Sequence, residues 1–197
     1  PGTCRGRYRD RREAERLTGI AAGLRLALPS GALTSVDRLR GPVSFCPEQE
    51  CGDFLLLRRD GMISYQLAVV VDDARQGVDQ VVRGDDLLPS AVRQERLYAA
   101  LGLAVPAWYH LPLVLDAQGR RLSKRGGAES LADWRQAGRD PRELVGWCAQ
   151  TLGLWRDPGP PPLRTPAEWL PEWDWSRVPL HSVVAPPLSG VATKDLA

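Results

Sequence analysis

Three short apolar runs, each closed by a turn that contains glycine, most constrain the fold of this 197-residue chain. They span Phe54 to Leu57, Val78 to Val82 and Leu111 to Leu115, and their length and composition are typical of buried strands. Between the second and third runs, the segment from Ser90 as N-cap to Gly102 as C-terminal stop has the apolar spacing of a helix. The order strand, helix, strand predicts an α/β fold.

Other segments extend this pattern. Alternating residues from Leu24 to Leu28 and the segment from Val36 to Val43 predict a pair of strands, and the run from Ile63 to Val71 is apolar enough to pack inside. Asp140 and the proline after it predict the start of a helix that ends near Gly153. Cys148 falls at helical spacing among leucine and valine there, so we expect it in the core.

Composition excludes two classes of protein. Hydrophobic residues make up 43% of the chain and charged residues 25%, as in globular proteins rather than disordered ones. No apolar run approaches the roughly 18 residues that a membrane helix needs. The formal net charge is +2, so the arginine-rich segment from Arg5 to Arg16 permits a polyanionic partner without requiring one.

The four cysteines, Cys4, Cys46, Cys51 and Cys148, are unevenly spaced, and no secretion signal precedes them. We therefore expect reduced thiols and a cytoplasmic protein. Cys46 and Cys51 enclose four residues, a looser spacing than in zinc knuckles, so a metal pair and two unpaired loop thiols both remain open.

Candidate chemistry concentrates in a basic loop. The sequence has neither a Walker pattern nor a dinucleotide fingerprint, and its only histidines are His110 and His181, so a phosphate loop or a nucleophilic triad is not expected. The segment RLSKR at 121–125 follows a predicted strand and a glycine turn. A lysine on such a loop suits a departing pyrophosphate, although the loop by itself is also typical of a solvated surface.

Five motifs together give a more specific indication: DFLLLRRDG at 53–61, YQLAVVVDD at 65–73, VRGDDLL at 82–88, HLPL at 110–113 and LSK at 122–124. In order and spacing they resemble the second half of the catalytic domain of glutamyl-tRNA synthetase-like class I enzymes, over about residues 41–155. The resemblance implies a Rossmann-like α/β domain that uses ATP as a substrate. It also implies a first half, with the family's ATP signature, before Pro1.

The resemblance assigns roles to individual residues. It implies that Tyr65 and Arg83 bind glutamate, where a guanidinium can hold a carboxylate through two hydrogen bonds. It implies that Leu122, Ser123 and Lys124 bind ATP, with Lys124 and Ser123 acting in catalysis on the phosphates. The arginines that flank this loop depart from the family pattern but keep its positive charge. For His110, on the strand before the loop, a structural hydrogen bond is expected rather than proton transfer.

Within the family the chain is most similar to a short paralogue that attaches glutamate to the queuosine base at the wobble position of tRNA(Asp). Residues 1–5 resemble the end of its zinc-binding insertion, with Cys4 at one of four zinc-ligand positions, and roughly forty residues follow Gly153, too few for anticodon-binding domains. We therefore expect zinc in the complete protein, a metal-free and inactive chain as given, and the anticodon loop of tRNA(Asp) as partner.

The expected organisation has four parts. Residues 1–23 end the zinc insertion and form a basic linker, 24–127 are the second half of the catalytic domain, 128–155 are helical, and 156–197 are an extension rich in proline and tryptophan that docks without a core of its own. We expect a monomer that binds no membrane. Two alternatives stay open, namely a glutamate-tRNA ligase that charges tRNA(Glu) and a non-catalytic tRNA-binding fragment.

Overall fold

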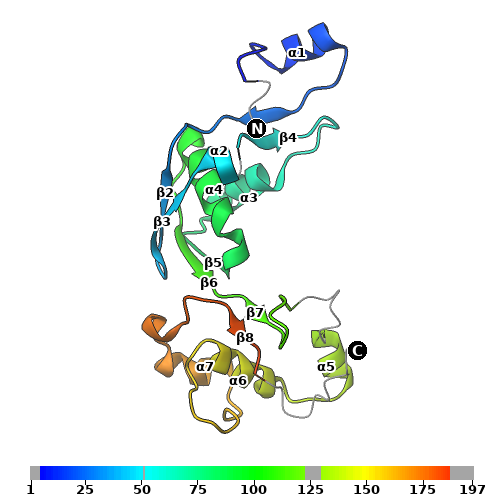
Figure 1. The fold of residues 1–197 in the computed structure, drawn as a ribbon. Coiled ribbons are helices and arrows are strands. Elements are labelled where there is room, and N and C mark those ends of the chain that lie inside the picture. Colours follow the sequence, from blue (N-terminus) through cyan, green and yellow to red (C-terminus); the bar gives the residue numbers. More distant parts are fainter. Residues whose placement is uncertain (1–4, 51, 123–129, 187–197) are drawn as a thin grey trace. The chain divides into compact units, whose positions relative to one another are not determined.

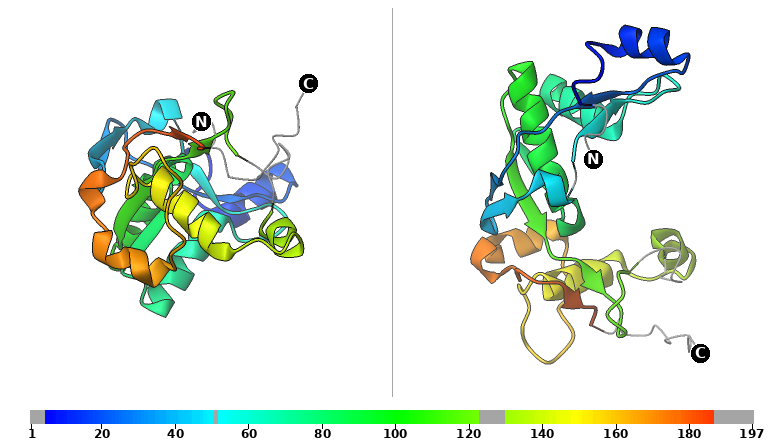
Figure 2. Two further views of the ribbon diagram at one scale, coloured as in Figure 1. Left: turned by 90° about the horizontal axis from the view of Figure 1, so that it is seen from below. Right: turned by 45° about the horizontal axis from the view of Figure 1, so that its top comes forward.

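The computed structural model describes residues 5–50, 52–122 and 130–186. The chain divides into two compact units, Pro1–His110 and Leu111–Ala197, which Figures 1 and 2 draw from three directions. Within the described ranges, no helix is both long enough and apolar enough to cross a membrane.

A four-stranded sheet forms the centre of the first unit (Figure 1). In the order β3-β2-β6-β5, its strands are β3 (Gly41–Phe45), β2 (Leu33–Asp37), β6 (Ala107–Leu111) and β5 (Gln80–Gly84). β2 runs antiparallel to β3 and parallel to β6. The parallel pair is separated in the chain by further strands and helices, as the predicted α/β fold requires.

Two helices pack together beside this sheet. They are α3 (Tyr65–Gln76) and α4 (Leu88–Leu101), and the short 3-10 helix η1 (Asp85–Leu87) leads into α4. α4 ends at Gly102, whose φ of 67° confirms the predicted C-terminal stop. The core between helices and strands is formed by apolar and aromatic residues: Leu28, Phe54, Val70, Ala91, Leu97, Tyr98 and Trp108.

The predicted pairing of the first strands is wrong. β1 (Leu24–Leu26) pairs antiparallel with β4 (Phe54–Leu57), and β2 pairs with β3 instead. Residues 36–43 are not one strand, because the Asp37 carboxylate accepts hydrogen bonds from the backbone N–H groups of Leu39 and Arg40 at 2.9 and 2.8 Å and closes a turn there. The unit also contains α1 (Arg11–Thr18) and α2 (Pro47–Glu50).

Burial around α3 and β5 is lower than predicted, and the predicted start of α4 is wrong. Only Val70 of α3 is buried, because a helix buries one face, and Ile63, which precedes the helix, is 59% exposed. The strand predicted at 78–82 is present as β5, but Val82 is 51% exposed since β5 ends the described sheet. Ser90 lies inside α4 rather than at its N-cap, and its hydroxyl accepts a hydrogen bond from Gln66.

The second unit is mainly helical. Its elements are β7 (Val114–Leu115), α5 (Leu131–Gln136), α6 (Pro141–Thr151), α7 (Pro166–Trp169), η3 (Leu170–Glu172), η4 (Trp175–Arg177) and β8 (Val183–Val184). The single strand predicted at 111–115 is wrong, because β6 ends at Leu111 and β7 begins at Val114, with Pro112 between them. β7 pairs parallel with β8. The Asp140 carboxylate accepts from the backbone N–H of Arg142, which confirms the predicted start of α6.

A second core lies in this unit, where Trp169 is buried against Ala149 and Leu154. The extension rich in proline and tryptophan thus shares a core with α6 and has no separate one among the described residues, whereas the prediction for Cys148 is wrong. Ala149, rather than Cys148, lies on the buried face of α6, and Cys148 is exposed.

Candidate functional site

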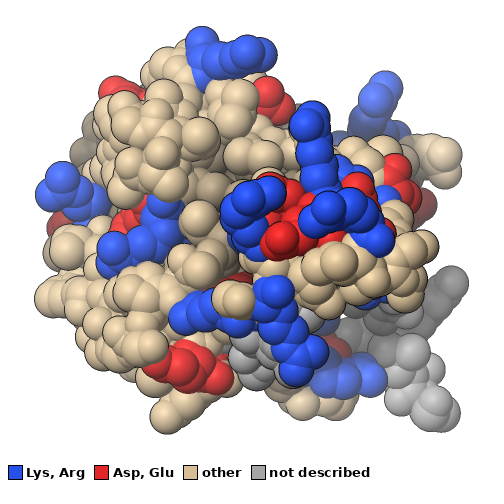
Figure 3. All heavy atoms as spheres, turned by 90° about the horizontal axis from the view of Figure 1, so that it is seen from above, with Lys and Arg blue, Asp and Glu red and all other residues tan. Residues whose placement is uncertain are grey.

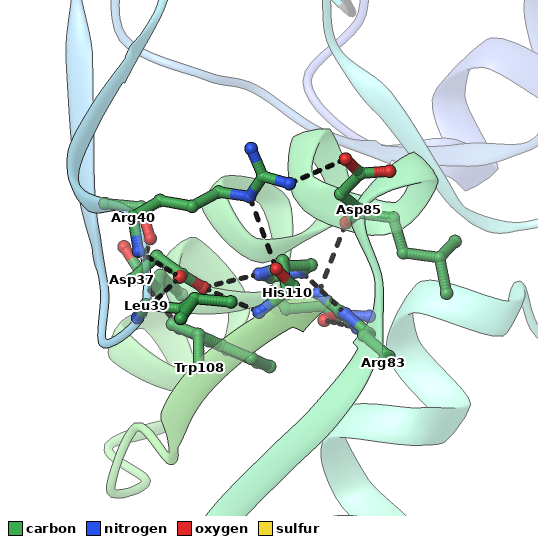
Figure 4. Close-up of polar contacts among 11 residues, drawn as sticks. Asp37, Leu39, Arg40, Arg83, Asp85, Trp108 and His110 are labelled. Carbon is green, nitrogen blue, oxygen red and sulfur yellow. Dashed lines mark hydrogen bonds and ion pairs between the residues drawn. The ribbon is translucent and has the colours of Figure 1, made fainter. Parts of the chain in front are cut away.

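Arg83 is the centre of a polar network at the end of β5 (Figure 4). Its guanidinium donates from Nε to Nε2 of His110 at 2.9 Å, from Nη1 to Oε1 of Gln94 at 2.8 Å and from Nη2 to the Leu87 carbonyl at 3.3 Å. Its Cζ lies 4.8 Å from the centre of a Trp108 ring. A guanidinium has five N–H groups, so these bonds leave one on each terminal nitrogen for a ligand.

The surroundings of Arg83 retain its positive charge. Burial lowers the pKa of Arg83, and the opposing effects of Tyr65, Asp73, Tyr98 and Asp37 raise it. These four side chains therefore lie close enough to act on the guanidinium charge. Because the ordinary arginine value is far above neutrality, Arg83 remains a cation near pH 7.

His110 lies on β6 and is completely buried. Its Nδ1 is 2.8 Å from Oδ2 of Asp37, and its Nε2 accepts the hydrogen bond from Arg83. Since Arg83 can only donate, Nε2 carries no proton, and the ring proton of the neutral imidazole is on Nδ1 and is donated to Asp37. Burial lowers the pKa of His110, more than the hydrogen bond to Asp37 raises it. The expected structural hydrogen bond of His110 is thus present.

Asp37 uses both carboxylate oxygens. Oδ1 accepts from the N–H groups of Leu39 and Arg40, and Oδ2 accepts from the His110 ring and, at 3.0 Å, from the His110 backbone N–H. Arg40, in the same turn, forms an ion pair with Asp85 of η1 at 2.7 Å and donates to the His110 carbonyl at 3.3 Å (Figure 4). The ends of β2, β5 and β6 are therefore linked by side chains.

A second arm of the network reaches α3. Gln94 on α4 receives the Arg83 hydrogen bond on its amide oxygen and donates through Nε2 to Oε1 of Gln66 at 2.9 Å. Gln66 in turn donates to the Ser90 hydroxyl at 3.1 Å. Tyr65, directly before Gln66, is the first residue of α3 and is 57% exposed, so its phenol is available to a ligand.

The structure places some of the predicted site residues and leaves others outside the described ranges. Tyr65 and Arg83 both belong to the first unit, and Tyr65 acts on the Arg83 charge. Leu122 is half-buried, and its N–H donates to the Val114 carbonyl at 3.1 Å. Ser123, Lys124 and Cys4 lie outside the described residues.

Potential metal ligands are scattered in this structure. No group of three or more potential metal-binding side chains occurs among the described residues. The Cys46 thiol donates to the Glu48 carboxylate at 3.3 Å, and this bond raises its pKa, away from the thiolate that a metal would require. Cys51 lies outside the described residues, so a metal pair and two unpaired thiols both stay predictions for Cys46 and Cys51.

Sequence reasoning missed Asp37, Arg40 and Gln94. Asp37 is 73 positions from His110 in the chain, and only the fold brings them together. A local signal existed for Asp37, since an aspartate at the end of a strand followed within four residues by glycine is typical of a turn. Gln94 is 1% exposed, and a buried glutamine in a helix requires a polar partner.

Comparison with known proteins assigns a class to this fold and site. The chain matches the family of class I tRNA synthetases (E and Q), catalytic domain, over residues 2–154, and it belongs to this family. The resemblance in the five sequence motifs is thereby confirmed, as is the predicted fold class.

Two individual members of the family are similar to this chain over different lengths. A glutamyl-Q tRNA(Asp) synthetase of Symbiobacterium thermophilum is 47% identical over 186 residues, which are 94% of this chain and 56% of that protein. A glutamate-tRNA ligase 1 of Methylorubrum extorquens is 44% identical over 149 residues, which are 72% of this chain and 31% of that protein. The chain thus spans about half the length, or less, of these curated relatives.

A solved structure agrees with the fold. The crystal structure of a glutamate tRNA ligase from Elizabethkingia meningosepticum, in complex with its amino acid, superposes with a TM-score of 0.70 at 25% sequence identity. The match covers 88% of this chain and 38% of that chain.

Proposed function

We propose that the protein to which this chain belongs activates glutamate with ATP and transfers it to the queuosine base at the wobble position of tRNA(Asp). The observation that carries the proposal is the Arg83 guanidinium, which has one N–H left on each terminal nitrogen, together with Tyr65, which is exposed and acts on the Arg83 charge. The glutamyl-Q relative supports this acceptor, because it matches more of the chain than the ligase relative does.

Arg83 and Tyr65 are proposed to bind glutamate. Paired N–H groups on one guanidinium suit the two oxygens of a carboxylate, and the neutral partners of Arg83, His110 and Gln94, leave its charge available to that ligand. The phenol of Tyr65 completes the pocket. Binding in this form orients glutamate for attack by a carboxylate oxygen on the α-phosphate of ATP.

The loop after β7 is proposed to act on ATP. The Leu122 backbone is anchored to Val114, and Ser123 and Lys124 follow it in the sequence. Lys124 would stabilise the charge on pyrophosphate as it leaves, with Ser123 donating a hydrogen bond beside it. A hydroxyl of the queuosine ring then attacks the glutamyl-adenylate and AMP leaves, so no side chain of the protein has to act as a nucleophile.

The arginine-rich helix α1 is proposed to contact tRNA phosphates. Figure 3 shows arginine and acidic side chains intermixed on this face of the molecule. Arg11 is paired with Glu15 at 2.9 Å, whereas Arg7, Arg12 and Arg16 have no ion pair within the described ranges. These arginines suit the backbone of an anticodon loop, and we expect transfer activity to fall steeply with salt because bound phosphates release counterions.

Three further expectations remain part of this proposal. Cys4 is proposed as one of four zinc ligands in the complete protein, and its place lies outside the described residues. The protein is proposed to act as a monomer and in the cytoplasm.

The acceptor is tested by incubating the full-length protein with labelled glutamate, ATP and purified tRNA. Glutamate should appear on queuosine-containing tRNA(Asp) and not on tRNA(Asp) that lacks queuosine. Label at the 3′ end of tRNA(Glu) would instead establish the glutamate-tRNA ligase alternative, which the Methylorubrum relative favours. Binding of tRNA without any activation of glutamate would establish the non-catalytic alternative.

A further inference from the structure

The hydrogen bonds of Asp37, His110 and Arg83 form one continuous path across β2, β6 and β5 (Figure 4). We propose that His110 is a positioning residue for substrate binding: held by Asp37 with its proton on Nδ1, it accepts the Arg83 Nε–H and fixes the guanidinium so that its two remaining N–H groups meet a substrate carboxylate. The inference rests on the proposed function for the identity of that substrate.

Three contacts at three different nitrogens define the position of the guanidinium. His110 holds Nε, Gln94 holds Nη1 and the Leu87 carbonyl holds Nη2, while the Trp108 ring lies against Cζ. Arginine has a long flexible side chain, so removal of the Nε contact would let the plane rotate about the other two. A rotated plane would direct its N–H groups away from one of the carboxylate oxygens.

The neutral state of His110 suits this role better than a charged group would. A carboxylate at this position would neutralise Arg83 and compete with the substrate for its positive charge. The neutral imidazole accepts the hydrogen bond without doing so, and the compensating carboxylate of Asp37 stays on the far side of the ring. The charged groups that face His110 are Asp37 from β2, Arg40 from the turn after β2 and Arg83 from β5.

Asp37 determines which ring nitrogen carries the proton. Each of its oxygens accepts two N–H groups, so an amide in its place must direct an NH₂ group at one of those pairs. When that NH₂ faces the ring, Nδ1 becomes the acceptor and the ring proton moves to Nε2. Nε2–H would then oppose Nε–H of Arg83, and the hydrogen bond between them would be lost.

The test measures glutamate-dependent exchange of pyrophosphate into ATP by the full-length protein, with KM determined separately for glutamate and for ATP. His110→Phe should raise KM for glutamate by at least about tenfold, the effect of a lost hydrogen bond to a charged group, and leave KM for ATP within about twofold. His110→Gln keeps an uncharged acceptor near the position of Nε2 and should stay within about threefold of wild type. Asp37→Asn should resemble His110→Phe.

The matched control is His181→Gln, the same substitution at the exposed histidine of the second unit, which should change neither KM. Thermal unfolding establishes that each variant is folded. Unchanged KM for glutamate in a folded His110→Phe variant would overturn the proposal, as would equal losses in the Gln and Phe variants or parallel rises in both KM values.

Nitrogen-15 NMR of the histidine rings in the wild-type protein tests the same assignment without a substitution. The His110 ring should carry its proton on Nδ1 at pH 7.5, and a proton on Nε2 or a charged ring would refute the role. Should the wild-type protein activate no glutamate, the proposed function fails, while the NMR result still decides the state of His110.

Discussion

Lowering the pH from 7.5 to 5.5 should destabilise the first unit through a single buried histidine. Burial lowers the pKa of His110 in the folded protein, whereas an unfolded histidine has a pKa of about 6.5. Below about pH 6.5 the unfolded chain therefore binds a proton that the folded chain does not. The stability due to the neutral ring is complete above that pH and is lost as the pH falls toward the folded value.

The size of the effect follows from one proton. If the ring stays neutral in the folded state, the free energy of unfolding falls by about 1.4 kcal/mol between pH 7.5 and 5.5. For a unit near 100 residues, each 1 kcal/mol corresponds to roughly 4–8 °C in Tm. Carboxylates contribute little in this range, because their ordinary pKa values lie near 4.

Circular dichroism melts at pH 7.5, 6.5 and 5.5 measure this loss. Between pH 7.5 and 5.5, Tm should fall equally in the wild-type protein and in the His181→Gln control. In His110→Gln, which has no ring to protonate, Tm should fall less, and the difference should correspond to about 1.4 kcal/mol. Equal slopes for the wild type and a folded His110→Gln variant would refute the linkage argument, since the ring would then not differ between folded and unfolded states.

Four further outcomes are expected. Lys124→Ala should slow pyrophosphate exchange at least about 10²-fold with glutamate affinity nearly unchanged, and unaltered exchange would place the loop at the surface. Arg83→Lys should weaken glutamate binding in a calorimetric titration, because an ammonium cannot reproduce the planar set of five N–H donors, and equal affinity would remove Arg83 from the site. Trp169→Ala should cost about 3–5 kcal/mol in urea unfolding, given its 4% exposure, and a smaller loss would mean that the second core collapses around the gap. The hydrogen bond from Arg5 lowers the pKa of Asp53, so the charged Asp53 stabilises the fold fully above the unfolded value of about 3.9 and progressively less as the pH falls below it; Asp53→Asn should therefore lower Tm more at pH 7 than at pH 3, and an equal loss at both pH values would contradict this.

Local signals predicted some helix ends, although not the start of α4, and they could not predict long-range strand pairing. Gly102 ends α4 and Asp140 begins α6 because their effects depend on neighbouring backbone groups alone. β1 pairs with β4, about thirty residues further on, and alternating leucines carry no information about which strand they will meet. The exposure of Val82 was not predicted either. Val82 is exposed because β5 is the last strand of the described sheet, and strand order cannot be read from the apolar run alone.

Some residues of the candidate site were predictable from the sequence, and others were not. Arg83 and Tyr65 were predicted because they occur within sequence motifs that resemble a known family. Gln94, which contacts Arg83, and Asp37, which contacts His110, belong to no such motif, and their contacts depend on how β2 and α4 pack against β5 and β6. The protonation state of His110 is a property of that packing as well, since it follows from a donor, Arg83, on one side of the ring and an acceptor, Asp37, on the other.

The side-chain links across the ends of β2, β6 and β5 have a consequence for binding entropy. Asp37, His110 and Arg83 come from three different strands, and Arg40 joins them to η1 through Asp85. The conformational freedom of the guanidinium is therefore given up when the chain folds, not when a ligand arrives. A carboxylate that binds here meets a preorganised partner, and its affinity is accordingly sensitive to substitutions that never touch it.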